Sequence, residues 1–365
     1  MSAKNLQAIQ VLRGVAATAV VCHHLADTVR EHSSIGLFWA RWFNTDAGSI
    51  GVDLFFVISG FIMAYATQDG TTTRRMFLYR RGIRIYPLYW FYSLVVLLVY
   101  FVLPWAGRVD ASGSDIAKSF ILYPTLTPMN LLRPAILPQG WTLSFELFFY
   151  LVFAIFLPLA LGRRVLIVTA TLFLAQMAAF LIPGKSAELA FLRDDTLLEF
   201  CFGLGIAYVC LRTRFRVGVF GFVVLLTLAF AALSPELFWL KAGEEPIHRI
   251  LRLGLSAAFT VAAFTWYNGP PWRFPRLTVL IGDASYTIYL LHVLVLTVAT
   301  ASKSFDRFID TNPNTAYFGL VAAALVLGVS FYFLVEKPLI QLLRSKRKTA
   351  SSSVVAVPEA VGVKT

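Results

Sequence analysis

Two residues with reactive side chains lie on one face of the first apolar segment. Arg13 and His24 are eleven residues apart, which in an α-helix is about three turns and brings both side chains to the same side. The helical rise separates them by roughly 16 Å. A neutral imidazole can take a proton from a hydroxyl group near pH 7, and a guanidinium can hold a phosphate. The spacing therefore predicts a general base, His24, working with a cation, Arg13.

Three more ionisable residues inside apolar segments lie at a similar depth. Counting from the segment ends places Glu146 and His292 with His24, roughly 20 Å from the inner side of a membrane core, and Asp53 somewhat nearer the outer side. Charged groups inside membranes are rare and usually face a polar cavity. This shared layer predicts a site in which Glu146 or Asp53 orients His24 or holds an acceptor. His292 is the second candidate for the base.

Each of these residues also has a structural interpretation. A single histidine can simply hydrogen-bond to a neighbouring helix, and Asp53 or Glu146 can hold helices together or form a buried ion pair with Arg13. Asp283 begins an apolar segment, where a carboxylate stabilises the N-terminus of a helix. Tyr289 can line a substrate site or pack in the core. The sequence leaves both interpretations open.

A cluster of arginines forms a second group of candidate residues. Arg80, Arg81 and Arg84 come directly before the aromatic run 85–90, at the inner entry of an apolar segment. Guanidinium groups bind phosphate oxygens through paired hydrogen bonds, which suits an anionic ligand. Such clusters also fix membrane topology and contact anionic lipids. Both functions fit the sequence.

The elements that must position these residues are membrane-spanning helices. The chain has 365 residues, of which 58% are hydrophobic and 14% charged, and its mean hydropathy is +0.70. This composition is too apolar for a soluble globular domain. Backbone groups in lipid must find hydrogen-bond partners within their own segment, so the spans must be helical. We expect an all-α integral membrane protein.

Apolar runs near the length of a membrane crossing occur about ten times. They predict about ten transmembrane helices around a polar central cavity, at 9–28, 50–67, 85–104, 139–161, 165–182, 197–211, 217–233, 249–267, 278–299 and 316–335. Basic residues gather in alternate connections and in the C-terminal segment, which follows the positive-inside rule if both termini are cytoplasmic. Residues 1–345 are expected to form the transmembrane domain, and residues 346–365, rich in Ala, Ser and Val, a disordered cytoplasmic tail.

The net charge of +12 does not indicate nucleic-acid binding, because the basic residues lie in short loops between apolar segments. Cys22, Cys201 and Cys210 all fall inside apolar segments, with neither a disulfide pattern nor the spacing of metal ligands. We therefore expect no bound metal and no permanently bound cofactor.

Five segments, taken in order, resemble the membrane acyltransferases of acyltransferase family 3. They are 6–14 leading to His24, 51–61, 80–87, 141–147 and 282–292. The spacing from Arg13 to His24 matches the family's Arg-x10-His pattern, and Arg81 with Arg84 matches its Arg-x-x-Arg loop. Each motif alone is weak, but all five in this order are specific, and the resemblance covers about 6–343.

The resemblance implies transfer of an acyl group, most often acetyl, from cytoplasmic acyl-CoA to a sugar hydroxyl of an exported polysaccharide or lipid-linked glycan. The texture of the segments is similar to bacterial exopolysaccharide acetylases, which implies an inner-membrane location among lipids and glycan-assembly proteins. Arg13, Arg80, Arg81 and Arg84 would bind the donor. Candidate substrate-binding residues from the later segments are His292, Tyr289, Ser285 and Trp141. Many relatives carry a fused extracytoplasmic domain that is not expected here, which implies direct transfer or a separate partner protein.

Transporters and polysaccharide polymerases or flippases are the alternative classes of membrane protein. A small-molecule or glycan transporter can also have ten spans with charges near the membrane centre, but no repeat symmetry or pair of broken helices is visible in the sequence. A polysaccharide polymerase or flippase would usually have larger outer loops. Transfer of acetyl groups from acetyl-CoA to glycans distinguishes an enzyme from both.

Overall fold

The computed structural model describes residues 3–41, 44–105, 111–127, 131–238, 249–270 and 273–343. Within these ranges the chain is helical and contains isolated β-bridges but no β-strand. The predicted tail 346–365 lies outside the described residues. The α-helices are α1 (Ala3–His32), α2 (Ile50–Ala66), α3 (Arg74–Val102), α4 (Gly113–Phe120), α5 (Trp141–Ile155), α6 (Leu161–Leu181), α7 (Ala187–Arg193), α8 (Glu199–Arg212), α9 (Val219–Phe238), α10 (Leu255–Trp266), α11 (Arg276–Asp283), α12 (Ser285–Thr300), α13 (Lys303–Thr311) and α14 (Pro313–Phe331).

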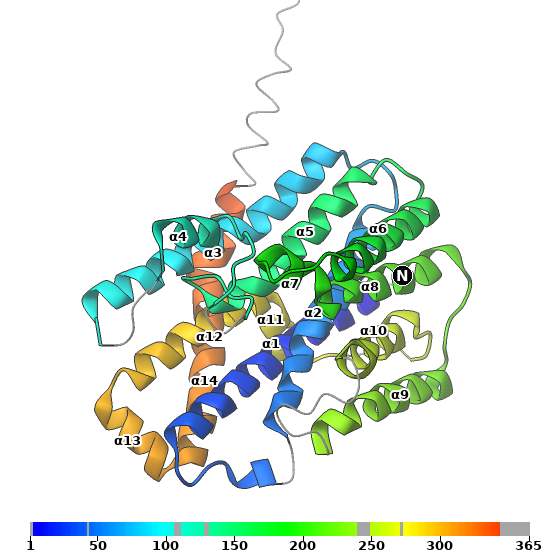
Figure 1. The fold of residues 1–365 in the computed structure, drawn as a ribbon. Coiled ribbons are helices and arrows are strands. Elements are labelled where there is room, and N and C mark those ends of the chain that lie inside the picture. Colours follow the sequence, from blue (N-terminus) through cyan, green and yellow to red (C-terminus); the bar gives the residue numbers. More distant parts are fainter. Residues whose placement is uncertain are drawn as a thin grey trace, which may run out of the picture.

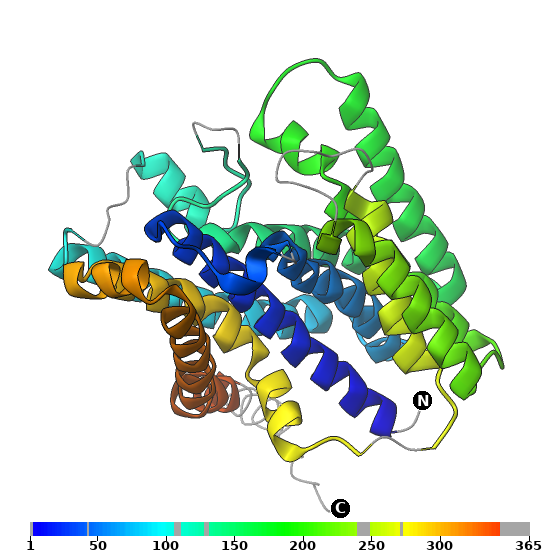
Figure 2. The same ribbon diagram turned by 90° about the horizontal axis from the view of Figure 1, so that it is seen from below.

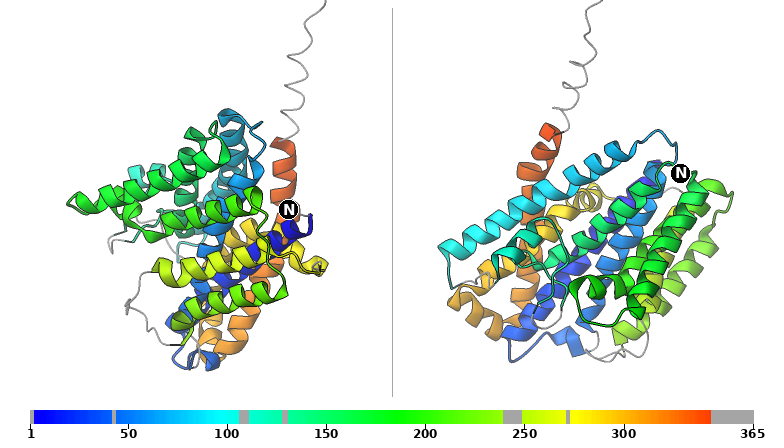
Figure 3. Two further views of the ribbon diagram at one scale, coloured as in Figure 1. Left: turned by 90° about the vertical axis from the view of Figure 1, so that its right-hand side faces the viewer. Right: turned by 45° about the horizontal axis from the view of Figure 1, so that its top comes forward.

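Helix α1 runs through the middle of the bundle (Figure 1). Seen from below, it lies between the group that contains α12, α13 and α14 and the group that contains α6, α8, α9 and α10 (Figure 2). Helices α3 and α5 lie next to each other across the bundle, and α2 lies beside α1 (Figure 3). Short segments join these helices: η1 (Phe38–Arg41), η2 (Thr45–Ser49), η3 (Pro138–Gly140), η4 (Asp195–Leu198), and the wider π-helical turns η5 (Ile250–Gly254) and η6 (Tyr332–Glu336).

Six helical segments of the described chain are long and apolar enough to cross a membrane: Leu6–His32, Asp46–Ala66, Arg74–Val102, Leu161–Leu181, Val219–Phe238 and Pro313–Leu343. Helices α11 and α12 form a pair bent by 72° that would add a seventh. The other predicted spans are helical but shorter, with 15 residues in α5, 14 in α8, and a 17-residue apolar run at Ile250–Trp266. The expected all-helical class is confirmed, whereas the count of ten spans is not, because these helices are shorter than a membrane crossing.

The outward faces of the bundle are apolar, as a lipid environment requires. Leu181 on α6 and Phe220 on α9 are 84% and 83% exposed, and Leu334 in η6 is 72% exposed. Exposed hydrophobic side chains of this size on helix after helix are typical of a surface solvated by lipid rather than water. The protein is therefore a multi-pass membrane protein.

Glycines bring three central helices into close contact. A side chain at Gly60 on α2 would come within 2.1 Å of the carbonyl oxygen of Phe200, and one at Gly203 on α8 within 2.0 Å of that of Val57. Gly51 on α2 meets the carbonyl oxygen of Ala16 on α1 in the same way, at 2.2 Å. Small residues allow helix backbones to approach closely where no hydrophobic force drives them together. Helix α2 is thus held tightly on two sides.

Candidate active site

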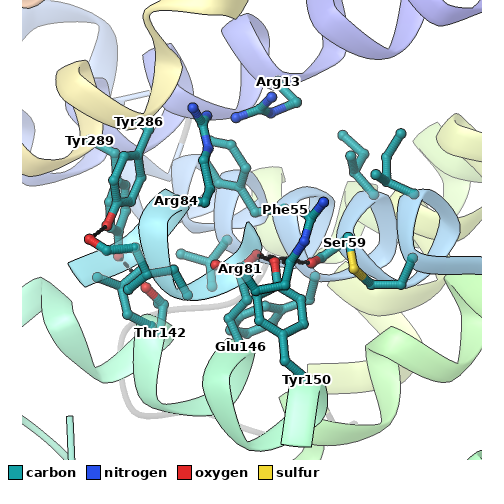
Figure 4. Close-up of a pocket in the computed structure, with 17 residues that line it drawn as sticks. Arg13, Phe55, Ser59, Arg81, Arg84, Thr142, Glu146, Tyr150, Tyr286 and Tyr289 are labelled. Carbon is teal, nitrogen blue, oxygen red and sulfur yellow. Dashed lines mark hydrogen bonds between the residues drawn. The ribbon is translucent and has the colours of Figure 1, made fainter. Parts of the chain in front are cut away.

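A cavity of about 130 Å³ lies between α1, α2, α3, α5 and α12. Phenylalanine, isoleucine and other apolar side chains form part of its wall, and polar side chains form the rest (Figure 4). The polar lining consists of Arg13, Ser59, Arg81, Arg84, Thr142, Glu146, Tyr150, Tyr286 and Tyr289. A concave pocket that combines apolar side chains with convergent polar groups is typical of small-molecule sites.

Three guanidinium groups reach the cavity from two helices. Arg81 and Arg84 lie three residues apart on α3 and so share a face, whereas Arg80 is exposed and outside the cavity lining. Arg84 donates to Glu336 at 2.7 Å and lies over the ring of Tyr286, 5.3 Å from its centre. Neither Arg13 nor Arg81 forms an ion pair with a described carboxylate. These two charges are therefore available to an anionic ligand.

Glu146 is the one carboxylate among the described residues that line the cavity. Its Oε1 accepts hydrogen bonds from the Ser59 hydroxyl at 2.9 Å and from the Tyr150 hydroxyl. Arg81 lies over the Tyr150 ring, 5.7 Å from its centre. The carboxylate is thus fixed in the cavity wall, with positive charge nearby.

Tyr289 and Phe55 lie together in the cavity wall, with their ring centres 5.9 Å apart. The Tyr289 hydroxyl donates to the carbonyl oxygen of Gln139 at 2.9 Å and lies 2.8 Å from the Thr142 hydroxyl. The Tyr289 ring centre is also 5.9 Å from that of His292, one helical turn further along α12. Tyr289 therefore contacts the cavity on one side and the histidine on the other.

His24 and His292 form a direct pair. Nδ1 of His24 lies 2.8 Å from Nε2 of His292, and the rings are nearly parallel. His292 is buried, while His24 is half-buried. Neither residue belongs to the lining of the cavity. Arg13 thus reaches the cavity from α1, whereas the His24 imidazole contacts His292, whose ring lies next to Tyr289 in the cavity wall.

The layer of four ionisable residues separates into three places. His24 and His292 are paired, and Glu146 lies in the cavity wall. Asp53 is fully buried on another face of α2, where its Oδ2 accepts from Arg249 at 2.7 Å. The geometry therefore does not bring Asp53 or Glu146 to His24 as the carboxylate that orients it, because His292 is the residue bonded to that imidazole.

Two of the remaining candidates also lie outside the cavity. Ser285 is fully buried. Trp141 packs edge-to-face against Phe145, with ring centres 5.8 Å apart, and against Phe56. Both side chains occupy positions that fit packing within the bundle.

The family model for the acyltransferase domain of acyltransferase family 3 matches residues 6–333. The chain belongs to this family. The resemblance seen in the five sequence segments is thereby confirmed. Its family and the named activity of its relatives identify the protein as a membrane-bound O-acyltransferase.

Three relatives of this acyltransferase show the range of the resemblance. The exopolysaccharide production protein ExoZ of Rhizobium meliloti is 28% identical over 83% of this chain and 93% of its own length. The acyltransferase MdmB of Streptomyces mycarofaciens is 26% identical over 98% of this chain and 97% of its own. The peptidoglycan O-acetyltransferase OatA of Listeria monocytogenes is 24% identical over 93% of this chain, which spans 56% of that relative. No solved structure matches.

The acyltransferase has one further site residue that the sequence pattern did not indicate. Glu336 is 1% exposed, accepts from Arg84 through Oε1, and accepts from the Thr287 hydroxyl through Oε2 at 2.6 Å. It therefore fixes the position of a cavity arginine. A usable signal was present, because Glu336 is an acidic residue in the region where the last predicted span ends.

Proposed function

We propose that the protein transfers an acyl group, specifically acetyl, from acyl-CoA to a hydroxyl of an exported polysaccharide or lipid-linked glycan. The observation that carries the proposal is the position of the His24–His292 pair directly beyond Tyr289, which is part of the wall of an arginine-containing cavity. A base and an anion-binding cavity separated by one aromatic side chain fit a reaction between a phosphate-bearing donor and a neutral hydroxyl.

The donor is proposed to bind at the arginine end of the cavity. Coenzyme A carries several phosphate charges, and Arg81 and Arg13 are cavity guanidinium groups without a carboxylate partner among the described residues. Arg84, held by Glu336, would add a third hydrogen-bonding group. In this arrangement the pantetheine arm extends along the cavity toward Tyr289, with the thioester nearest to the histidine pair, and Arg13 holds the arm or polarises the thioester.

The reaction proposed at the histidine pair begins with removal of the acceptor's hydroxyl proton. If Nδ1 of His24 donates to Nε2 of His292, then Nε2 of His24 has a free lone pair and takes that proton. The sugar oxygen forms a bond to the thioester carbonyl carbon, the carbon–sulfur bond breaks, and the imidazolium returns the proton to the departing thiolate. His292 thus supplies the orienting contact that a carboxylate supplies in a catalytic triad.

The remaining partners follow from the same proposal. Glu146 has the position to hold donor or acceptor hydroxyl groups in the cavity, rather than to orient His24. The bacterial inner membrane, with both termini in the cytoplasm, would give access to acyl-CoA on one side and to the glycan on the other. Glycan-assembly proteins are the expected protein partners.

The decisive test measures transfer of a labelled acetyl group from acetyl-CoA to membrane glycans in vesicles that contain the full chain. His24→Ala is expected to lower the rate by roughly 10²- to 10⁴-fold, the usual contribution of a general base. His23→Ala is the matched control, because His23 is next in the chain but pairs with Asp27. Full activity of His24→Ala would refute the assigned base, and unlabelled glycans in wild-type vesicles would refute the proposed donor or acceptor.

A further inference from the structure

A second group of buried charges lies on the face of α2 that packs against α8. Asp53 from α2 and Glu199, the first residue of α8, are both fully buried. Arg249, which directly precedes η5, donates to Oδ2 of Asp53 at 2.7 Å. None of the three residues lines the cavity described above.

The two carboxyl groups of this cluster interact with each other. Apart from that contact, no described residue donates a hydrogen bond to Oδ1 of Asp53 or to either carboxyl oxygen of Glu199. The Nε atom of Arg249 likewise has no acceptor among the described residues. Gly254 closes the cluster from η5, since a side chain there would come within 3.3 Å of Oε1 of Glu199. Buried polar atoms are rarely left without partners.

The charges that described residues place around the cluster do not balance it. Arg252 from η5 is paired with Glu236 of α9 and also interacts with Asp53. Asp194, which precedes η4, accepts from the backbone and side chain of Thr196 and also interacts with Arg249. Among the described residues, two guanidinium groups, those of Arg249 and Arg252, therefore face the four carboxyl groups of Asp53, Glu199, Asp194 and Glu236. An uncompensated charge in such surroundings is strongly unfavourable.

We propose that Asp53 and Glu199 share one bound proton, so that the two carboxyl groups and Arg249 form an electrically neutral cluster joining α2, α8 and η5. A proton between the carboxyl groups supplies the missing donor and removes the excess negative charge in one step. A metal cation is the less suitable occupant, because Arg249 already provides the positive charge on one side of Asp53. The site is a proton-binding site separate from the acyl-transfer residues.

The shared proton links the stability of the fold to pH. The stabilisation is fully present below the pH at which the carboxyl groups of the unfolded chain release their protons, and it is lost as the pH rises from there through the value at which the folded cluster releases its proton. Above that pH a buried carboxylate remains without a counter-charge. The unfolding temperature of the protein in detergent micelles should therefore fall progressively as the pH rises from the acidic range, until the folded cluster has released the proton.

Infrared spectroscopy of the purified full chain at neutral pH tests the proposal directly. The wild-type spectrum is expected to contain a protonated-carboxyl stretching band that Glu199→Gln removes and that Asp53→Asn also removes, since one proton serves both groups. Glu236→Gln is the control, because that carboxylate is paired with Arg252, and the band should persist. Glu199→Gln should unfold within about 2 °C of wild type at acidic pH and lose the decline with rising pH.

Two results would overturn the proposal. One is a band that persists in both Glu199→Gln and Asp53→Asn. The other is a wild-type unfolding temperature that falls when sodium is replaced by choline at constant ionic strength, which would identify a cation site. Should Glu199→Gln fail to fold, Asp53→Asn provides the spectrum, and loss of folding by Glu199→Gln alone would show that Glu199 is ionised.

Discussion

Helix α2 has the cavity on one side and helix α8 on another, and the two sides differ in packing and in the sign of their excess charge. On the cavity side, Arg81 and Arg13 provide positive charge next to open space. On the α8 side, Gly60 and Gly203 bring the backbones together, and the buried cluster of Asp53 with Glu199 has more carboxyl groups than guanidinium groups. An open cavity with positive charge suits an anionic ligand that binds reversibly. A packed interface with excess carboxyl groups suits a proton that remains bound.

The difference shows why depth in the membrane does not by itself define a site. Asp53 lies one residue from Val52, which lines the cavity, yet the 100° turn per residue directs it to the other face. Residues at one level of the bundle can therefore belong to separate sites with opposite charge.

The largest effect is expected where a cavity arginine is also part of the packed structure. Arg84→Met leaves the buried Glu336 carboxylate without its guanidinium, which should lower the free energy of unfolding by about 3–5 kcal/mol. The double variant Arg84→Met/Glu336→Gln removes both charges and should recover much of this loss in thermal denaturation. Acyl transfer should stay low in the double variant if Arg84 contacts the donor. Recovery of transfer together with stability would show that Arg84 acts only through packing.

Neighbouring arginines on α3 test the cavity side alone. Arg81 lines the cavity and Arg80 is exposed outside it. If Arg81 binds a donor phosphate as proposed, Arg81→Gln removes a hydrogen bond to a charged group, worth about 1.5–3 kcal/mol, so the KM for acyl-CoA should rise roughly 10- to 100-fold. Arg80→Gln should leave the KM nearly unchanged. Equal effects of both variants would mean that the cluster attracts the donor only through its summed charge.

A pair of glycines tests the packed side. Gly60→Ala would place its Cβ 2.1 Å from the carbonyl oxygen of Phe200, so α2 and α8 would have to move apart. The expected loss is about 1–3 kcal/mol in the free energy of unfolding. Gly205→Ala on α8 is the matched control, since nothing lies within 4 Å of the added carbon, and it should cause no loss. A stable Gly60→Ala variant would indicate that the two helices are not in close contact.

Much of the fold and part of the site could be predicted from the sequence. Long apolar runs require helices in lipid, so every predicted span coincides with a helical segment. The spacing of Arg13 and His24 placed both on the side of α1 that faces α12 and the cavity. The separation of Arg80 from Arg81 and Arg84 could not be predicted, because helical periodicity places Arg84 near both Arg80, four residues earlier, and Arg81, three residues earlier.

The rest depended on how each helix is rotated. Helix α2 is apolar almost all round, so no polar stripe indicates which face meets the cavity, and Asp53 could not be assigned to Arg249. The contact between His24 and His292 joins residues 268 positions apart, which depth suggests but cannot fix. Glu336 could not be assigned to the site from the sequence, because its partner, Arg84, lies on a helix far away in the sequence.

The smallest expected effect concerns the aromatic boundary between the cavity and the histidine pair. Tyr289→Phe keeps the ring but removes the hydroxyl contacts with Gln139 and Thr142. Losing a hydrogen bond of this kind costs roughly 0.5–1.5 kcal/mol, so the ring should become less fixed and the transfer rate should change by about 2- to 10-fold. Tyr286→Phe is the control, because its hydroxyl donates to the carbonyl oxygen of Ile85 from the same cavity wall. If Tyr286→Phe changes the transfer rate as much as Tyr289→Phe, then the position of Tyr289 next to His292 has no special importance, and the boundary between donor cavity and base must lie elsewhere.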